Sequence, residues 1–190
     1  MYYYRRGLKE LENKFKIIQI DYEYLNERPS IDHIKSRIKS PESIINKLKK
    51  HNMPLTYKSI EEDLNDVIGI RVIVPLKSDI ETIYNYIKEM NDVEILKVKD
   101  YVSNPKPSGY RSFHVLIRFP IYVNRTLNYV KAEIQIRTLA MDFWASLEHI
   151  IQYKNNKKLC DIPNSNISTQ LSECSKDIEK LDNKMTNFFL

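Results

Sequence analysis

Glycine is scarce in this sequence, with only Gly7, Gly69 and Gly109 among 190 residues. Loops that wrap nucleotide phosphates with backbone N–H groups need several closely spaced glycines. The chain therefore has neither a P-loop nor a dinucleotide-binding glycine motif. If it binds phosphates, it must do so with side chains.

Cysteine and long apolar runs are scarce as well. The two cysteines, Cys160 and Cys174, neither form a disulfide framework nor belong to a cluster of metal-binding residues. No apolar run approaches the ~20 residues that span a bilayer, and the opening Met1–Arg6 stretch lacks the apolar segment of a secretion signal. These absences predict a cytoplasmic protein without a membrane partner.

The composition is that of one ordinary domain. Apolar residues make up 42% of the chain, enough for a core, and charged residues make up 29%. Lysine and arginine outnumber acidic residues by 30 to 25, which gives a net charge of +5. This mild excess suits an anionic partner such as a nucleotide or nucleic acid, but it does not choose between them.

Apolar residues spaced three and four positions apart predict an amphipathic helix near each end. The first pattern runs from Leu8 to Leu25 and stops before Pro29. The second runs from Ile167 to Phe188 over three heptads, a pattern typical of a helix that needs a partner. That partner can be the first helix, the body of the domain or another subunit.

Strands and helices alternate between these two patterns. Ser40 is a helix N-cap followed by proline, which predicts a helix over 41–51. The β-branched run Val67–Val74 predicts a central strand, with a helix over 80–87 behind it. Three more strands are expected at about 93–101, 111–119 and 129–137. Their short connections favour antiparallel pairing, so the expected class is α/β or α+β, with a mixed, largely antiparallel sheet flanked by helices.

The last of these strands has a polar face. Ile134 and Ile136 alternate with Glu133, Gln135 and Arg137, so one face is apolar and the other presents a carboxylate, an amide and a guanidinium. Solvent-exposed strands often have such a face. Taken alone, this polar face is as consistent with a solvent-exposed surface as with a binding site.

Two other segments gather residues suited to anions. Arg37, Lys39 and Lys47 surround the predicted start of the 41–51 helix, and a helix N-terminus itself favours anions. Asp66 precedes the strand that carries Arg71, and an arginine in an aliphatic run needs an anionic or aromatic partner. A carboxylate at a strand edge can hold Mg²⁺ or simply form a turn. Strand alternation places Asp66 and Arg71 on opposite faces unless Asp66 belongs to the preceding turn.

A third segment combines aromatic and basic residues. Prolines and Gly109 form a loop that delivers Tyr110 onto a strand. Strand geometry predicts Tyr110 and His114 on one face, about 13 Å apart. The tyrosine is suited to stacking on a base, while Lys106 and Arg111 are suited to holding phosphates. His114 alone is equally consistent with a structural hydrogen bond.

In this order, the segments resemble the synthetase region of the RelA/SpoT family, and in particular its small alarmone synthetases. The resemblance runs from about residue 37 to residue 154. It rests on Arg37-x-Lys39 with Lys47, Asp66–Arg71, Pro105–His114, Glu133–Thr138, and Met141–His149 with Tyr153–Lys154. It implies a nucleotidyltransferase-like synthetase fold with helical N- and C-terminal extensions. The expected divisions are an N-terminal helix over 1–28, a catalytic domain over 29–157 and a C-terminal helix over 158–190.

The resemblance implies a GTP/GDP pyrophosphokinase of stringent-response signalling. Such an enzyme transfers pyrophosphate from ATP to the ribose 3′-hydroxyl of GTP or GDP, giving (p)ppGpp and AMP. It implies that ATP contacts Arg37, Arg71, Lys39 and Lys47, the arginines on the adenine and the lysines on the phosphates. It implies that Asp66 and Glu133 are catalytic and bind Mg²⁺, with Glu133 also activating the 3′-hydroxyl.

For the acceptor, the same resemblance implies contacts from Lys106, Tyr110, Arg111, His114, Gln135 and Asp142. Asp142 stands where relatives often have asparagine, which would alter the preference between GTP and GDP. No His-Asp dipeptide occurs, and the chain lacks room for the hydrolase domain of long relatives, so we expect synthesis without hydrolysis. Relatives of this size form homotetramers through their terminal helices, and the heptad pattern suits that assembly.

Two alternatives remain open. A toxin-like relative would place the pyrophosphate on the 3′ end of tRNA, and the positive charge permits RNA binding, as acceptor or regulator. The complete segment from Tyr110 to His114 favours a free nucleotide instead. A non-catalytic module could bind single-stranded RNA with tyrosine and lysine side chains. It would gain nothing from Asp66 and Glu133 without a metal.

Overall fold

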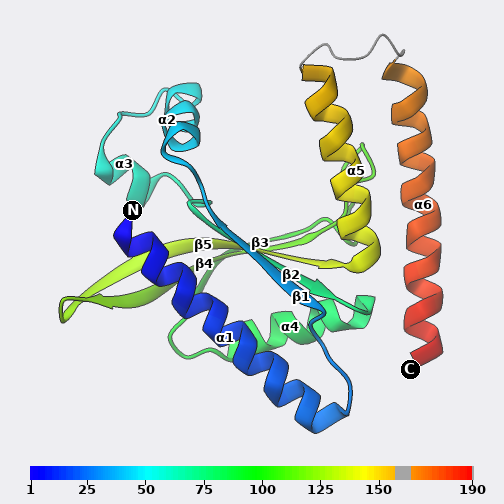
Figure 1. Cartoon of the computed structure of the whole chain (residues 1–190), viewed down its shortest axis with the longest axis horizontal. Helices are drawn as coiled ribbons and strands as arrows, with labels where there is room; N and C mark the ends of the chain where they lie inside the picture. Colours follow the sequence, from blue (N-terminus) through cyan, green and yellow to red (C-terminus); the bar gives the residue numbers. More distant parts are fainter. Residues whose placement is uncertain (157–163, 190) are drawn as a thin grey trace.

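The fold is a five-stranded sheet with helices on both faces (Figure 1). The computed structural model describes the backbone of residues 1–156 and 164–189, and the side chains of 1–151 and 169–189. In chain order the elements are α1 (Tyr2–Asn26), β1 (His33–Ile38), α2 (Pro41–Lys50), α3 (Tyr57–Glu62), β2 (Ile68–Val74), α4 (Lys77–Glu89), β3 (Glu94–Asp100), β4 (Phe113–Val123), β5 (Thr126–Thr138), α5 (Leu139–Asn156) and α6 (Asn164–Phe189).

The sheet is mixed, and most of its pairs are antiparallel. The strand order is β1-β2-β5-β4-β3. Only β2 and β5 run parallel, while β1–β2, β3–β4 and β4–β5 are antiparallel. The predicted class and the antiparallel pairing of the last strands are confirmed. The parallel pair lies in the centre, where α1 and α4 keep its aliphatic face from water.

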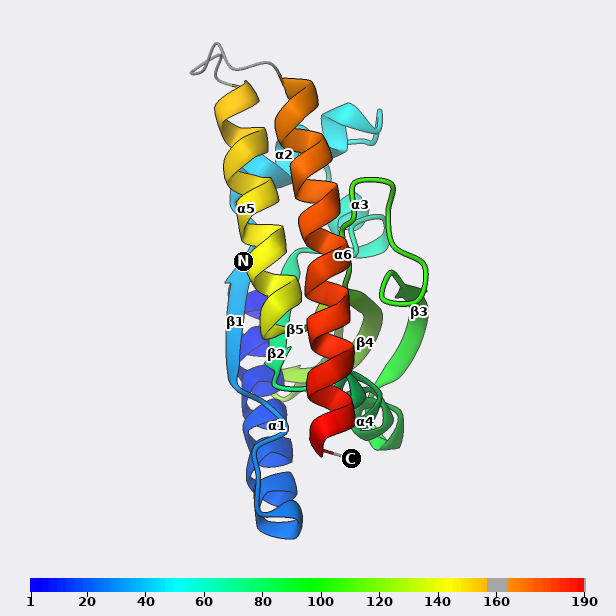
Figure 2. The same cartoon turned by 90° about the vertical axis from the view of Figure 1, so that its right-hand side faces the viewer.

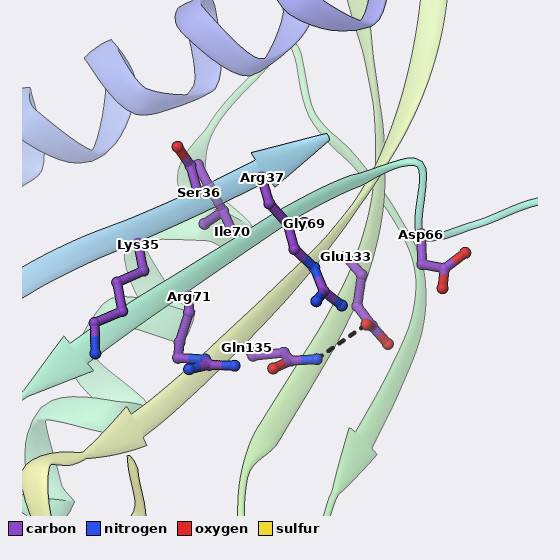
Figure 3. Close-up of a pocket in the computed structure, with 9 residues that line it drawn as sticks. All are labelled: Lys35, Ser36, Arg37, Asp66, Gly69, Ile70, Arg71, Glu133 and Gln135. Atoms are coloured by element: carbon purple, nitrogen blue, oxygen red, sulfur yellow. Dashed lines mark hydrogen bonds between the residues drawn. The ribbon is translucent and has the colours of Figure 1, made fainter. Parts of the chain in front are cut away.

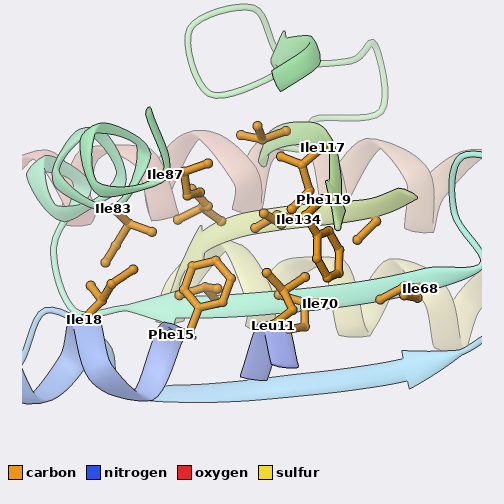
Figure 4. Close-up of a cluster of buried hydrophobic side chains, with 14 of the residues drawn as sticks. Leu11, Phe15, Ile18, Ile68, Ile70, Ile83, Ile87, Ile117, Phe119 and Ile134 are labelled. Atoms are coloured by element: carbon orange, nitrogen blue, oxygen red, sulfur yellow. The ribbon is translucent and has the colours of Figure 1, made fainter. Parts of the chain in front are cut away.

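Helices α1 and α4 cover one face of the sheet and bury the main core (Figures 1 and 4). Leu11 and Phe15 of α1 and Ile83 of α4 are fully buried against sheet residues such as Ile117 and Ile134. Helix α1 supplies part of this core. A domain boundary after residue 28, as expected from the sequence, would therefore separate residues of one hydrophobic cluster. The first helix therefore belongs to the folding unit that supports the sheet.

Helices α2 and α5 lie on the opposite side of the sheet, and α6 runs beside α5 (Figures 1 and 2). The predicted helix after Ser40 is confirmed, and the Ser40 hydroxyl accepts the Ser43 N–H at 3.2 Å. None of the helices in the described ranges is long and apolar enough to cross a membrane.

Two elements had not been expected: strand β1 and the short helix α3. The segment His33–Ile38 carries charged residues, and its stability as an edge strand comes from pairing with β2 along its whole length. That pairing joins residues 30 to 40 positions apart, so local sequence patterns do not reveal it. Helix α3 has six residues, too few to show a periodic pattern.

The predicted apolar stripe of α6 divides into two parts. Leu171, Cys174 and Ile178 are half-buried, and Ile178 lies against a small cavity with Met141 and Trp144, whereas the C-terminal part of the stripe faces away from the domain. Leu181, Met185 and Phe188 are 55%, 44% and 82% exposed, whereas Ser175 and Asp182 are buried. The body of the domain is therefore not the partner of these three exposed residues, and the first helix or another subunit remains. Two other residues of the sequence analysis, Cys160 and the Ile167 side chain, lie outside the described residues.

Candidate active site

The three strands β1, β2 and β5 form the floor of a polar cleft. Residues paired across neighbouring strands share one face of a sheet. The register places two such rows side by side, Arg37–Gly69–Glu133 and Lys35–Arg71–Gln135. All six line one cavity, together with Ser36, Asp66 and Ile70 (Figure 3). The cavity holds about 160 Å³, less than the ~300–1,000 Å³ of sites that enclose a ligand, so a nucleotide would lie in an open cleft.

Asp66 stands at one end of this cleft and gathers two cations. It lies in the turn before β2, which settles how it can share a cavity with Arg71. Lys39 Nζ and Lys47 Nζ donate to its two carboxylate oxygens at 2.5 and 2.8 Å. Burial alone would raise the pKa of Asp66, but the bonds and charges of the two lysines outweigh it and the pKa is lowered. The carboxylate is therefore ionised at neutral pH.

Two arginines lie on the cleft floor. The Arg37 side chain crosses β2 above Gly69, where an added Cβ would lie 3.5 Å from Arg37 Cγ. Arg71 Nε is buried and has no hydrogen-bond partner among the residues that the structure describes. Burial, and then the charge of Arg137, lowers the pKa of Arg71, despite the nearby carboxylate of Asp142. An anionic or aromatic ligand would relieve this cost, as the sequence analysis required of an arginine in an aliphatic strand.

A closed ring of hydrogen bonds joins five side chains on the same face. Arg137 Nη2 donates to the Tyr110 hydroxyl at 2.6 Å and to Gln135 Oε1 at 3.0 Å. Gln135 Nε2 donates to Glu133 at 3.1 Å, and His114 bridges Glu133 at 3.2 Å and the Tyr110 hydroxyl at 3.0 Å. Because the tyrosine oxygen already accepts from Arg137, we assign its proton to His114 Nε2. His114 Nδ1–H then donates to Glu133.

The ring fixes the charge and direction of Glu133. The hydrogen bond from His114 is the main cause that lowers the pKa of Glu133, while burial and the charge of Asp66 oppose it. Glu133 and Asp66 thus face one cavity, and the negative charge of Asp66 acts on Glu133. Within the described residues, no group of three or more His, Cys, Asp and Glu side chains could hold a metal. Mg²⁺ often takes only one or two carboxylates, with phosphates and waters as its other ligands, so this pair fits the ion.

The placement of Tyr110 corrects one expectation. Its ring centroid lies 6.0 Å from that of His114, which contradicts the predicted separation along a strand. Strand β4 begins only at Phe113, so Tyr110 lies in the preceding loop, which folds back over the strand. Lys106 Nζ lies over the Tyr110 ring, 4.8 Å from its centroid. Tyr110, His114 and Lys106 are therefore close together, and their acceptor roles stay predictions.

Asp142 lies at the other end of the cleft and contacts three cations. It is 6% exposed and accepts hydrogen bonds from Lys35, Arg71 and Arg137 at 2.9–3.1 Å. The family resemblance implied that Asp142 contacts the acceptor and Arg71 contacts ATP, but in the structure the two side chains are hydrogen-bonded to each other. Lys35 was missed, although its alternation with Arg37 in a strand would have placed both on one face.

Arg111 is the predicted site residue that the structure does not bring to this cleft. Its guanidinium donates to the Val102 carbonyl at 2.8 Å and to Glu179 of α6 at 2.5 Å. The side chain of Arg111 is 12% exposed. Tyr153 and Lys154, which completed the last sequence motif, lie outside the described side chains.

The fold and the cleft define a class of protein. An ionised carboxylate pair shares one sheet face with lysines and arginines that reach it from β1, β2 and α2. This arrangement suits an enzyme that binds phosphorylated substrates, brings two of them together and neutralises their charge.

Comparisons with known proteins identify the family. A sequence model described as a region found in RelA / SpoT proteins matches residues 36–158. The GTP pyrophosphokinase YwaC of Bacillus subtilis (strain 168) is 45% identical over 182 residues, which cover 96% of this chain and 85% of that protein. The chain belongs to the RelA/SpoT family.

Solved structures agree with this assignment. The crystal structure of small alarmone synthetase 2 from Bacillus subtilis has a TM-score of 0.85 and 44% identity, and the match covers 98% of this chain and 94% of that one. Small alarmone synthetase 1 from Bacillus subtilis, bound to its product pppGpp, has a TM-score of 0.85 and 32% identity, covering 97% of this chain and 92% of that one. The likeness includes the helical segments at both ends of the chain.

Proposed function

We propose that the chain is a GTP pyrophosphokinase that transfers pyrophosphate from ATP to the 3′-hydroxyl of GTP or GDP, giving (p)ppGpp and AMP. The relatives named above support this reaction, since they match nearly the whole chain. The structural observation that carries it is Glu133. This carboxylate is ionised, oriented by His114 and Gln135, and faces the same cavity as Asp66 and the two arginines.

ATP would lie over β1 and β2. Arg37 and Arg71 project from neighbouring strands into one cavity, so a flat adenine ring can lie between or against their guanidinium planes. Lys39 and Lys47 would hold the phosphates, exchanging part of their contact with Asp66 for contact with phosphate oxygens. The cost of this exchange is low because each lysine remains beside an anion.

Glu133 would accept the proton of the attacking 3′-hydroxyl. A base must be ionised and must lie within hydrogen-bond reach of that proton. The bonds from His114 and Gln135 hold the Glu133 carboxylate in the ionised form and in one orientation. Asp66 and Glu133 would also bind Mg²⁺, which offsets phosphate charge during transfer.

The acceptor would occupy the side of the cleft near β4. The Tyr110 ring would stack on guanine, and Lys106, which lies over that ring, would move to the acceptor's phosphates. Gln135 and His114 line the path between this ring and Glu133. We also propose that the reaction takes place in the cytoplasm, where ATP and guanine nucleotides are available.

Incubation with ATP labelled in its β-phosphate tests the reaction. With GDP or GTP as the acceptor, thin-layer separation should show label in a guanosine nucleotide that carries a 3′-diphosphate. Label transferred only to tRNA would favour the toxin-like alternative. Binding of single-stranded RNA with no transfer to any acceptor would favour a non-catalytic module.

We further propose that the chain forms a homo-oligomer, a tetramer by analogy, through its terminal helices. Helix α1 exposes Ile17, Ile20 and Tyr24 at helical spacing, and α6 exposes the stripe described above. Such exposed apolar rows are typical of surfaces that another protein covers. In this proposal residues 29–157 carry the catalytic site, while the terminal helices also serve assembly.

A further inference from the structure

We propose that helix α6 holds the loop between β3 and β4 in the shape that accepts the guanine nucleotide, with Ser175 and Glu179 as positioning residues. This inference rests on the proposed function, because it concerns the loop that carries Lys106 and Tyr110. No residue of α6 was assigned to the site from the sequence, and none of the α6 side chains that the structure describes lines the nucleotide cavity.

The loop has few internal constraints of its own. Its backbone bonds join Tyr101 to Ser112 at the base, and Lys106 to Gly109 and Tyr110 at the tip. Gly109 has a φ of +91°, which other residues rarely adopt. At the base, the N–H groups of Val102 and Ser103 also donate to Asp100, at 2.8 and 2.9 Å. These bonds fix the base more than the tip, and the tip samples several shapes unless side chains outside the loop hold it.

Helix α6 runs beside this loop (Figure 2), and its side chains supply those external contacts. The Ser175 hydroxyl donates to the Gly109 carbonyl at 2.7 Å. Glu179 accepts from Arg111 at 2.5 Å, and the same guanidinium donates to the Val102 carbonyl at 2.8 Å. One arginine thus connects α6 to both ends of the loop.

Tyr110 lies between the two anchored residues, Gly109 and Arg111. With both neighbours fixed, its hydroxyl is directed to His114 and Arg137. Gly109 packs closely against α6, since an added Cβ at Gly109 would lie 2.8 Å from the Ser175 Cβ. Loss of the anchor would therefore change the position of the tyrosine ring before it changed the strands beneath.

The anchor also explains why Arg111 is buried away from the cleft. If Arg111 held acceptor phosphates, its guanidinium would have to leave Glu179 and the Val102 carbonyl, and the loop would lose its tie to α6. Arg111 therefore acts as a positioning residue. Within the loop, the cation that lies over the Tyr110 ring is Lys106.

Steady-state kinetics of Glu179→Ala test the inference against a matched control. The variant should raise the KM for GDP roughly tenfold, the effect of losing a hydrogen bond to a charged group, with little change in the KM for ATP. Glu179→Gln, which keeps an oxygen for Arg111, should recover most of the loss. Asn183→Ala removes a different α6 contact, to Lys77, and should leave both KM values unchanged. Equal effects on both substrates, or equal effects of Glu179→Ala and Asn183→Ala, would overturn the inference.

A double-mutant cycle separates the two roles of Arg111. If Glu179 acts through Arg111, then adding Glu179→Ala to Arg111→Ala should raise the KM for GDP no further than Arg111→Ala alone, which also removes the bond to the Val102 carbonyl. Additive effects would mean that Arg111 contacts the nucleotide independently of α6, and would overturn the inference.

Hydrogen exchange of the loop amides gives a test that does not depend on activity. The N–H groups of Lys106 and Gly109 are bonded inside the loop and should exchange faster in Glu179→Ala than in Asn183→Ala. Unchanged exchange would overturn the anchor even in an active enzyme. Faster exchange in a protein that transfers no pyrophosphate would support the anchor and contradict the proposed function.

Discussion

Asp142 balances the charges at one end of the cleft. Its carboxylate is the shared acceptor of Lys35, Arg71 and Arg137, and the bond from Lys35 and the charge of Arg71 keep its pKa low, although burial favours the neutral acid. Three cations that converge on one buried carboxylate repel each other once it is neutralised. The residue is therefore needed for the shape of the site before any ligand binds.

Replacement of this carboxylate should destabilise the protein. Asp142→Asn leaves the three cations without their anion, and we expect the free energy of unfolding to fall by about 3 kcal/mol, as when one partner of a buried ion pair is removed. Urea denaturation measures this. The matched control Asp177→Asn breaks an exposed ion pair with Lys180 and should cost less than ~0.5 kcal/mol. Equal costs for the two variants would contradict the account.

Single residues were predictable from the sequence where local alternation decides their direction. Glu133 and Gln135 were placed on one polar face by the alternation of β5, and the structure shows them bonded to each other. Arg111 was not predictable, because its partner Glu179 lies 68 positions away on a helix whose packing partner the sequence left open. The contact between Asp142 and Arg71 spans 71 positions and was missed for the same reason.

Among the elements, α2 shows how a local signal can serve a site. Its N-cap and following proline could be identified from the sequence, and its length and direction bring Lys47 to Asp66. Strand β1 is the opposite case. Only its pairing with β2 makes it a strand, and this pairing brings Lys35 and Arg37 to the cleft.

Loss of a helix cap should affect ATP binding only where the helix carries a site residue. Ser40→Ala and Thr56→Ala each remove a side-chain cap, on α2 and α3 respectively, and each should cost about 1 kcal/mol of stability. Only Ser40→Ala should raise the KM for ATP, because α2 carries Lys47. A rise of the same size in Thr56→Ala would show that the effect is global destabilisation.

At the scale of the whole molecule, one side of the sheet supplies stability and the other supplies chemistry. The buried aliphatic face under α1 and α4 holds the strands in register, and the register places charged residues in rows on the other face. The sheet class was predictable because the aliphatic runs are strong signals. The order of its strands was not, since it depends on long-range pairing.

Removal of the exposed stripe of α6 should reduce the size of the assembly. We expect light scattering to give the wild-type protein a mass that is a multiple of 22.6 kDa. The double variant Leu181→Ser, Phe188→Ser should give a smaller mass, because both side chains are exposed in the single chain. Tyr122→Ser, at another exposed aromatic, on the β4–β5 hairpin, is the control and should keep the wild-type mass. A monomeric wild-type protein at micromolar concentration would contradict the assembly.

The most direct test of the central claim is pyrophosphate transfer by Glu133→Gln. Glutamine keeps the size of the side chain and one of the two oxygens that accept from His114 and Gln135. It cannot accept the proton of a hydroxyl or offer a full negative charge to Mg²⁺. In the labelled-ATP assay with GDP, we predict that kcat falls by at least about 100-fold, while the melting temperature stays close to that of the wild type. A folded Glu133→Gln protein that makes (p)ppGpp at the wild-type rate would contradict the account.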